Sequence, residues 1–329
     1  MYQRFYGLRE LPFELTPNPK YLYLPPKHRE ALSNLEYGLF AAKSLTVLVG
    51  EAGTGKTTLL RAALESERCV NVRCVYLNNP ALTRAEFVSM LATRFNLSVD
   101  ASHSKAALLE ELEAALRVRR KAGEVTALVV DEAQTLSVEL LEEIRLLANI
   151  ETTEEKLLPL VLAGQPELSV RLEDPALRQL KQRVALRCDV VPFQLSETAA
   201  YIASRIRTAG GVPSKLFTRE AVALIHEHAG GIPRTISVIC DNALVSGMAL
   251  ERQPVDRGIV LEVCEDFHLE GRAAESDAWM DDSARPVVEP MPVLPDGSAT
   301  SDTSGELTKD RTQSPLKARR FSLFGSGRR

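Results

Sequence analysis

One stretch constrains the fold of this chain more than any other: an apolar, β-branched run that breaks into a glycine-rich turn. Residues 45–58 read LTVLVGEAGTGKTT. Gly50, Gly55, Lys56 and Thr57 have the spacing of a phosphate-binding loop between a strand and a helix. Glycines let several backbone N–H groups face one anion, and a helix that begins at Lys56 adds its positive end. The alternative is a chance glycine-rich turn, but all four positions and both flanks match.

Chemistry assigns a role to each part of this loop. Lys56 would bring a positive charge to the β- and γ-phosphates of ATP and assist catalysis, and the Thr57 hydroxyl would hold Mg²⁺. The full set of expected nucleotide contacts from the loop is Gly50, Glu51, Ala52, Gly53, Thr54, Gly55, Lys56, Thr57 and Thr58. The pattern predicts a bound nucleotide and does not say how its energy is used.

A second apolar run, residues 125–130, ends in Asp131 and Glu132. A carboxylate at the carboxyl edge of a parallel sheet can hold Mg²⁺ directly or through water, which is the expected role of Asp131. Glu132 would polarise the attacking water as a general base. The alternative is a surface Asp-Glu pair after a core strand. The order and separation of the two motifs favour the site.

Short apolar runs alternate with helical patterns over the first two thirds of the chain, which predicts an α/β fold with a parallel sheet. The expected strands are 45–49, 70–77, 125–130, 158–163 and 184–190. After Pro192 only helices are expected. We therefore divide the chain into an N-terminal collar and helix (1–43), an α/β core (44–191), a small all-α domain (192–268) and a disordered tail (269–329). Prolines and aromatics make the first 25 residues an extended collar.

Composition excludes several classes of protein. The 329 residues carry a net charge of −4, so there is no global argument for nucleic-acid binding. No run approaches the ~18 apolar residues of a membrane span, and no secretory signal is visible. Five cysteines without a C-x-x-C pair indicate reduced thiols. We expect a cytoplasmic protein, either free or peripheral at the inner membrane, without a structural metal.

Taken together, the motifs resemble those of AAA+ ATPases. The sequence in and around the motifs is similar to that of the ExeA/GspA-type ATPases of bacterial secretion and pilus systems. The resemblance covers roughly residues 1–268. It implies a P-loop NTPase core closed by a helical lid. The matching stretches include Tyr6-Gly-Leu, Asp131-Glu-Ala-Gln, Gly164-Gln-Pro-Glu-Leu and Gly230-Gly-Ile-Pro-Arg.

The resemblance implies roles for residues outside the two motifs. Gln165 matches sensor 1, a polar group that helps orient water near the γ-phosphate. Arg234 matches sensor 2, an arginine of the lid that contacts phosphate. Asn78 matches a polar position that restrains Glu132. The alternative for Arg234 is a simple arginine at the start of a helix.

A further implied role depends on a neighbouring subunit. Arg183 lies where AAA+ proteins carry an arginine finger, and Arg178 is a rival for the position. Such a finger would stabilise transition-state charge at a neighbour's γ-phosphate. The resemblance therefore implies a homo-oligomer.

Three functions remain open at this point. The first is an ATPase that drives assembly or remodelling in a bacterial secretion, pilus or exopolysaccharide export system, together with a membrane-protein partner. The second is a DNA-associated ATPase resembling transposition helpers or Orc/Cdc6-type loaders. A salt-dependent DNA shift would separate it from the first. The third is a nucleotide-gated switch with little turnover.

Overall fold

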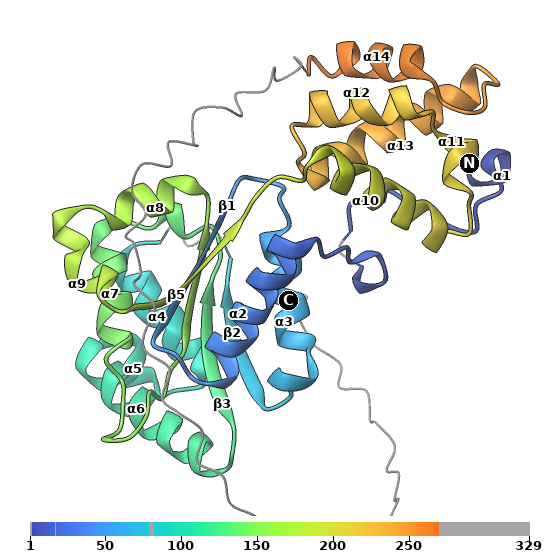
Figure 1. The fold of residues 1–329 in the computed structure, drawn as a ribbon. Helices are drawn as coiled ribbons and strands as arrows, with labels where there is room; N and C mark the ends of the chain where they lie inside the picture. Colours follow the sequence, from blue (N-terminus) through green and yellow to red (C-terminus); the bar gives the residue numbers. More distant parts are fainter. Residues whose placement is uncertain (1, 17, 79–81, 270–329) are drawn as a thin grey trace, which may run out of the picture. The chain divides into compact units, whose positions relative to one another are not determined.

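The computed structural model describes residues 2–16, 18–78 and 82–269 (Figure 1). At its centre lies a five-stranded parallel sheet with the order β2-β3-β4-β1-β5. β1 is flanked by β4 and β5, so the glycine-rich loop leaves the sheet from an interior strand. The five predicted strands are confirmed, with β2 and β4 beginning two residues later than expected. Their bounds are β1 Leu45–Gly50, β2 Val72–Leu77, β3 Val125–Val130, β4 Leu160–Gly164 and β5 Val184–Val190.

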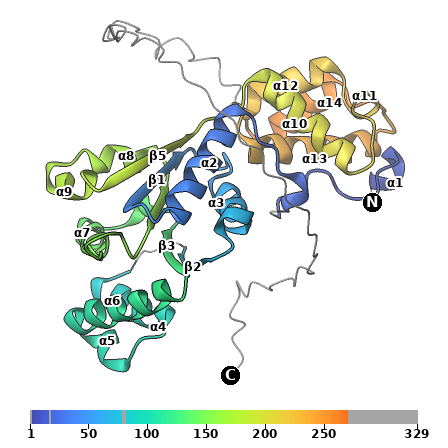
Figure 2. The same cartoon turned by 60° about the horizontal axis from the view of Figure 1, so that its bottom comes forward.

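Side chains of the strands alternate between two covered faces, which gives three layers (Figure 2). Val47 and Leu128 belong to the larger core, under α4 (Arg84–Phe95), α5 (Val99–His103), α6 (Lys105–Lys121), α7 (Val138–Leu147), α8 (Pro166–Leu172) and α9 (Arg178–Lys181). Leu48 and Val129 belong to the opposite core, under α2 (Pro26–Phe40) and α3 (Lys56–Glu65). Burial on both faces explains why the three interior strands, β3, β4 and β1, are almost continuously apolar.

After β5 the described chain is helical, as predicted. Five helices surround a separate core that includes Ile206, Ile225 and Leu244. They are α10 (Leu195–Thr208), α11 (Pro213–Leu216), α12 (Arg219–Ala229), α13 (Pro233–Ala249) and α14 (Arg257–Asp266). Among the residues described, no helix has the length and apolar character needed to cross a bilayer. Of the predicted tail, residues 269–329, all but residue 269 lie outside the described residues.

The N-terminal segment, residues 2–25, packs on these helices. Its first residues form α1 (Tyr2–Tyr6), a short helix where extended chain was expected, because the prolines begin only at Pro12. α1 contacts α13, and Phe13 packs edge-on against Phe217 at 6.2 Å between ring centroids. Since the following α2 covers the sheet, the chain passes between the sheet and the helical part twice, before α2 and after β5.

The second of these passages contains a close backbone approach. The Phe193 N–H donates to the Gly231 carbonyl at 2.8 Å. Gly231 has φ +72°, and a Cβ on it would lie 2.1 Å from the Phe193 carbonyl oxygen. Only glycine fits such a contact, so the Gly230-Gly231 pair holds the start of α13 against the chain that leaves β5.

Candidate nucleotide-binding site

The glycine-rich loop has the backbone shape that its sequence predicts. Gly53 and Gly55 have φ of +83° and +103°, in the left-handed region that favours glycine, and α3 begins at Lys56 as expected. The Gly53 carbonyl accepts the backbone N–H of Arg234 at 3.2 Å, and a Cβ on Gly53 would lie 2.9 Å from the Arg234 Cβ. The start of α13 is therefore seated directly on the loop.

Lys56 lies across the inside of this loop. Its Nζ donates to the carbonyls of Gly50 at 2.8 Å and Glu51 at 3.0 Å, and the residue is 6% exposed. Burial lowers the pKa of the Lys56 ammonium, and the nearby carboxylates of Glu132 and Asp131 act in the opposite direction. The lysine is thus held among acceptors, in a position from which it can bind an anion at the loop.

Asp131 lies beside Thr57, as the two motifs predict. The Thr57 hydroxyl donates to Asp131 Oδ2 at 2.8 Å. The same oxygen accepts the Tyr76 hydroxyl at 2.5 Å. Tyr76 was missed by sequence reasoning. The available signal was a hydroxyl-bearing aromatic near the end of an otherwise mainly apolar strand that neighbours β3.

Glu132 is held by a residue to which the sequence assigned no role. Its backbone has φ +55°, and its Oε2 accepts the Gln134 side-chain N–H at 2.7 Å. Gln134 Oε1 accepts the backbone N–H of Gln165 at 3.1 Å. One amide therefore joins the ends of β3 and β4. Asn78 is exposed, and the contact that restrains Glu132 in this structure comes from Gln134.

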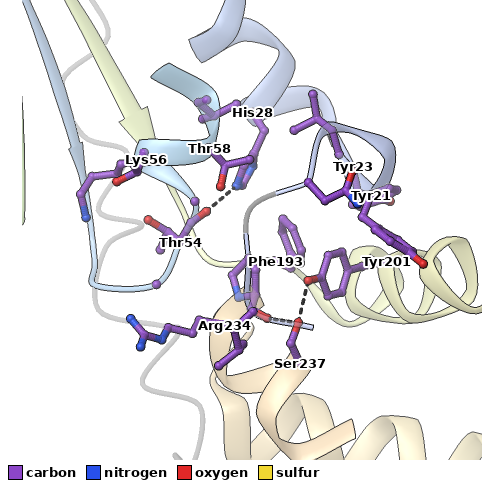
Figure 3. Close-up of a pocket in the computed structure, with 18 of the residues that line it drawn as sticks. Tyr21, Tyr23, His28, Thr54, Lys56, Thr58, Phe193, Tyr201, Arg234 and Ser237 are labelled. Atoms are coloured by element: carbon purple, nitrogen blue, oxygen red, sulfur yellow. Dashed lines mark hydrogen bonds between the residues drawn. The ribbon is translucent and has the colours of Figure 1, made fainter. Parts of the chain in front are cut away.

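The loop and Glu132 line one end of a cavity of about 410 Å³ that extends to a cluster of aromatic rings (Figure 3). The rings come from α10 and from the two connections between the sheet and the helical part, before α2 and after β5. Tyr23 packs edge-on against Phe193 at 5.7 Å, and Phe193 lies 5.4 Å from Tyr201. His28 lies between the two ends: its Nε2 is 3.3 Å from the Thr54 carbonyl, and burial lowers its pKa. The cavity thus has a polar end and an aromatic end.

Arg205 lines the aromatic end and was also missed by sequence reasoning. It is 9% exposed, and its guanidinium donates to the Tyr201 hydroxyl at 2.5 Å and to the Glu14 carbonyl at 3.3 Å. Its charge also lies 4.9 Å from the centre of the Tyr21 ring. Arg205 therefore links the N-terminal segment to α10.

The predicted arginines lie in different places. Arg234 lines the cavity, and its side chain extends along the loop (Figure 3).

Arg183 directly precedes β5, whose first residue pairs with Leu45 at the beginning of β1. Five residue steps of strand, about 16 Å, separate that end of β1 from Gly50. Arg183 therefore lies at the opposite edge of the sheet from the loop of its own chain. Arg178, the rival, is exposed at the start of α9.

The residues present fit a nucleotide with Mg²⁺. Thr57 and Asp131 bring two hard oxygen atoms together, the type of ligand that Mg²⁺ prefers. The loop and the N-terminus of α3 offer backbone N–H groups to phosphate. The cavity volume lies within the range of small-molecule sites.

Comparison with known proteins agrees with this geometry. Residues 41–172 match the model of the AAA domain family. The chain is also 41% identical over 249 residues to general secretion pathway protein A (GspA) of Aeromonas hydrophila. This is a GspA-like AAA-domain protein. The alignment covers 76% of the chain and 45% of the relative, so the chain spans less than half of that protein's length. The resemblance stated from the motifs is confirmed.

Solved structures show the same AAA+ fold. The Aeropyrum pernix ORC1 protein in complex with DNA is similar with a TM-score of 0.58 and 21% identity, over 79% of this chain and 70% of that one. The Aeropyrum pernix ORC2 protein, solved in ADPNP–ADP complexes, is similar with a TM-score of 0.56 and 16% identity, over 78% and 71%. At these identities the likeness establishes the fold of the AAA-domain protein alone. The AAA domain implies that it binds a nucleotide.

Proposed function

We propose that this AAA-domain protein hydrolyses ATP with Mg²⁺ and uses the energy to drive assembly or remodelling in a bacterial secretion system. The observation that carries the proposal is that Lys56, Thr57 and Glu132 line one end of a cavity that Arg234 also lines. Asp131 is hydrogen-bonded to Thr57 at that end. The similarity to GspA supports the secretion role. The catalytic core would be residues 44–191 and the lid residues 192–268.

Each residue has a distinct task in the proposed reaction. Lys56 and the N–H groups of the loop bind the β- and γ-phosphates. Mg²⁺, held by Thr57 and Asp131, would supply positive charge between those phosphates. Glu132 takes the proton of the attacking water, in a position set by Gln134.

The lid and the aromatic rings complete the site. Arg234 contacts phosphate from the start of α13, where a cation is electrostatically unfavourable unless an anion lies near. Gln165, whose backbone is fixed by Gln134, helps to orient the water. The aromatic end, with Tyr23 and Phe193, takes the base.

The direct test is the release of phosphate from ATP by the purified chain. We expect turnover with Mg²⁺ and only the buffer background in EDTA. Bound nucleotide without any turnover would contradict hydrolysis and favour a nucleotide-gated switch. The secretion role predicts that the protein co-purifies with inner-membrane secretion components in an ATP-dependent manner. If no such component co-purifies with ATP, with ADP or without nucleotide, that role is contradicted.

We further propose that subunits associate and that Arg183 acts on a neighbour's nucleotide. Arg183 precedes the residue that pairs with Leu45, and about 16 Å of strand separates Leu45 from Gly50 at the loop end of β1. Arg183→Ala and Lys56→Ala subunits should each be inactive alone. Mixed, they should recover part of the turnover, because one interface in the mixture pairs an intact loop with an intact arginine. The measurement is phosphate release across mixing ratios. The matched comparison is the same mixing experiment with Arg178→Ala in place of Arg183→Ala. If mixtures of Arg183→Ala and Lys56→Ala subunits stay inactive at every ratio, Arg183 does not act on a neighbour's nucleotide.

A further inference from the structure

The Asp131 carboxylate is surrounded by hydrogen-bond donors. Its Oδ2 accepts the hydroxyls of Tyr76 at 2.5 Å and Thr57 at 2.8 Å, and its Oδ1 accepts the backbone N–H of Glu132 at 3.0 Å. The residue is 3% exposed. A buried carboxylate requires such donors, and two of the three come from residues that already have a role in the proposed reaction, Thr57 at the start of α3 and Glu132 directly after Asp131. Tyr76 is the donor with no role in the proposed reaction.

The third donor is built into the sheet. Tyr76 is the next-to-last residue of β2 and is paired with Val129, two residues before Asp131 on the neighbouring strand. Its ring is partly buried against the core under α2 and α3. A tyrosine hydroxyl has an ordinary pKa of about 10, so at neutral pH it carries its proton and can donate a hydrogen bond.

The geometry restricts what this hydrogen bond can do. The χ2 torsion of an aspartate is broad, so a carboxylate at a metal site needs partners to fix its plane. Tyr76 approaches from the strand, on a rigid element, whereas Thr57 approaches from the helix that carries the loop. The oxygen between them is thereby held beside the Thr57 hydroxyl, which is the other expected Mg²⁺ ligand.

We propose that Tyr76 is a positioning residue for the divalent cation: its hydroxyl fixes the Asp131 carboxylate beside Thr57, so that cation binding strengthens nucleotide binding. This rests on the proposed function, in which Thr57 and Asp131 hold Mg²⁺. Tyr76 itself touches neither nucleotide nor cation. Removing its hydroxyl should leave the loop intact and weaken the link between the cation and the nucleotide.

The test is Tyr76→Phe, which keeps the ring in the core and removes one oxygen atom. The dissociation constant of a fluorescent ADP analogue is measured in EDTA and at saturating Mg²⁺. In EDTA, the variant should bind within about twofold of the unchanged protein. In the unchanged protein, Mg²⁺ should lower the dissociation constant by a certain factor, and in the variant this factor should be about tenfold smaller. A tenfold loss is the lower end of the effect of removing a hydrogen-bond partner of a metal ligand. Tyr37→Phe, on an exposed ring of α2, is the matched control and should change neither value.

Each other outcome is decisive. If Tyr76→Phe shows the same Mg²⁺-dependent tightening as the unchanged protein, the hydroxyl merely satisfies a buried carboxylate and the proposal is wrong. If the variant fails to show cooperative thermal unfolding in EDTA, the hydroxyl is structural, and this too overturns the proposal. If the unchanged protein binds no nucleotide or shows no Mg²⁺ effect, the proposed function fails instead.

Discussion

Replacing Lys56 by alanine should abolish measurable nucleotide binding. The Lys56 ammonium is held inside the loop by the carbonyls of Gly50 and Glu51, so its charge is already in place before a phosphate arrives. Little side-chain entropy remains to be lost, and a charge-assisted contact in a buried site is among the strong ones. We expect the dissociation constant of a fluorescent ADP analogue to rise by about 100-fold or more, equivalent to roughly 3 kcal/mol.

The control for this prediction is Lys27→Ala. Lys27 is exposed on α2 and pairs with Glu30, so its loss should change nucleotide affinity by less than about twofold. Thermal unfolding without nucleotide should show both variants folded, because neither lysine belongs to one of the apolar cores. If the nucleotide affinity of Lys56→Ala stays within about threefold of that of the unchanged protein, phosphate does not bind at this loop.

Replacing Glu132 by glutamine should separate binding from turnover. The amide has the size of the carboxylate and can keep an oxygen acceptor toward Gln134, so the site should retain its shape. An amide cannot take a proton from water at neutral pH. General-base catalysis contributes on the order of 10²–10⁴ in rate, so phosphate release in a single turnover should slow by about 100-fold or more.

Nucleotide affinity, measured in parallel on Glu132→Gln, should stay within about threefold of the unchanged protein. Glu139→Gln is the matched control, because Glu139 is an exposed carboxylate in the first turn of α7. It should leave both binding and turnover unchanged. Turnover by Glu132→Gln at the rate of the unchanged protein would assign the base to another group.

Much of the fold could be predicted because its signals are local. β3 has the predicted bounds, since a strand buried on both faces is a continuous apolar run that turns polar where it leaves the sheet. β5 also has the predicted bounds, although it is an edge strand in which exposed residues, among them Arg187 and Asp189, alternate with more buried ones. The helix at Lys56 follows from the glycines before it. The five-residue helix α5 could not be predicted in this way, because it is too short to show a periodicity.

The site residues that could be predicted also have local signals, and the others do not. Thr57 and Asp131 could be placed together from sequence because two motifs with known chemistry occur in the right order. Tyr76, Gln134 and Arg205 could not, because their contacts depend on the register of neighbouring strands and on the packing of an N-terminal segment against a helix nearly 200 positions away. Such contacts leave no local pattern in the sequence.

The two passages between the sheet and the helical part limit how the cavity can open. A body attached at one point can swing in any direction, whereas a body attached at two points turns about the line that joins them. Here the points lie before Pro26 and around Phe193, and residues of both passages, Tyr23 and Phe193, pack against each other at the cavity. A rigid-body opening of the helical part would therefore be a rotation about one axis that runs beside the aromatic rings. In such a rotation the parts of the helical part farthest from that axis would move most, and the rings would move least.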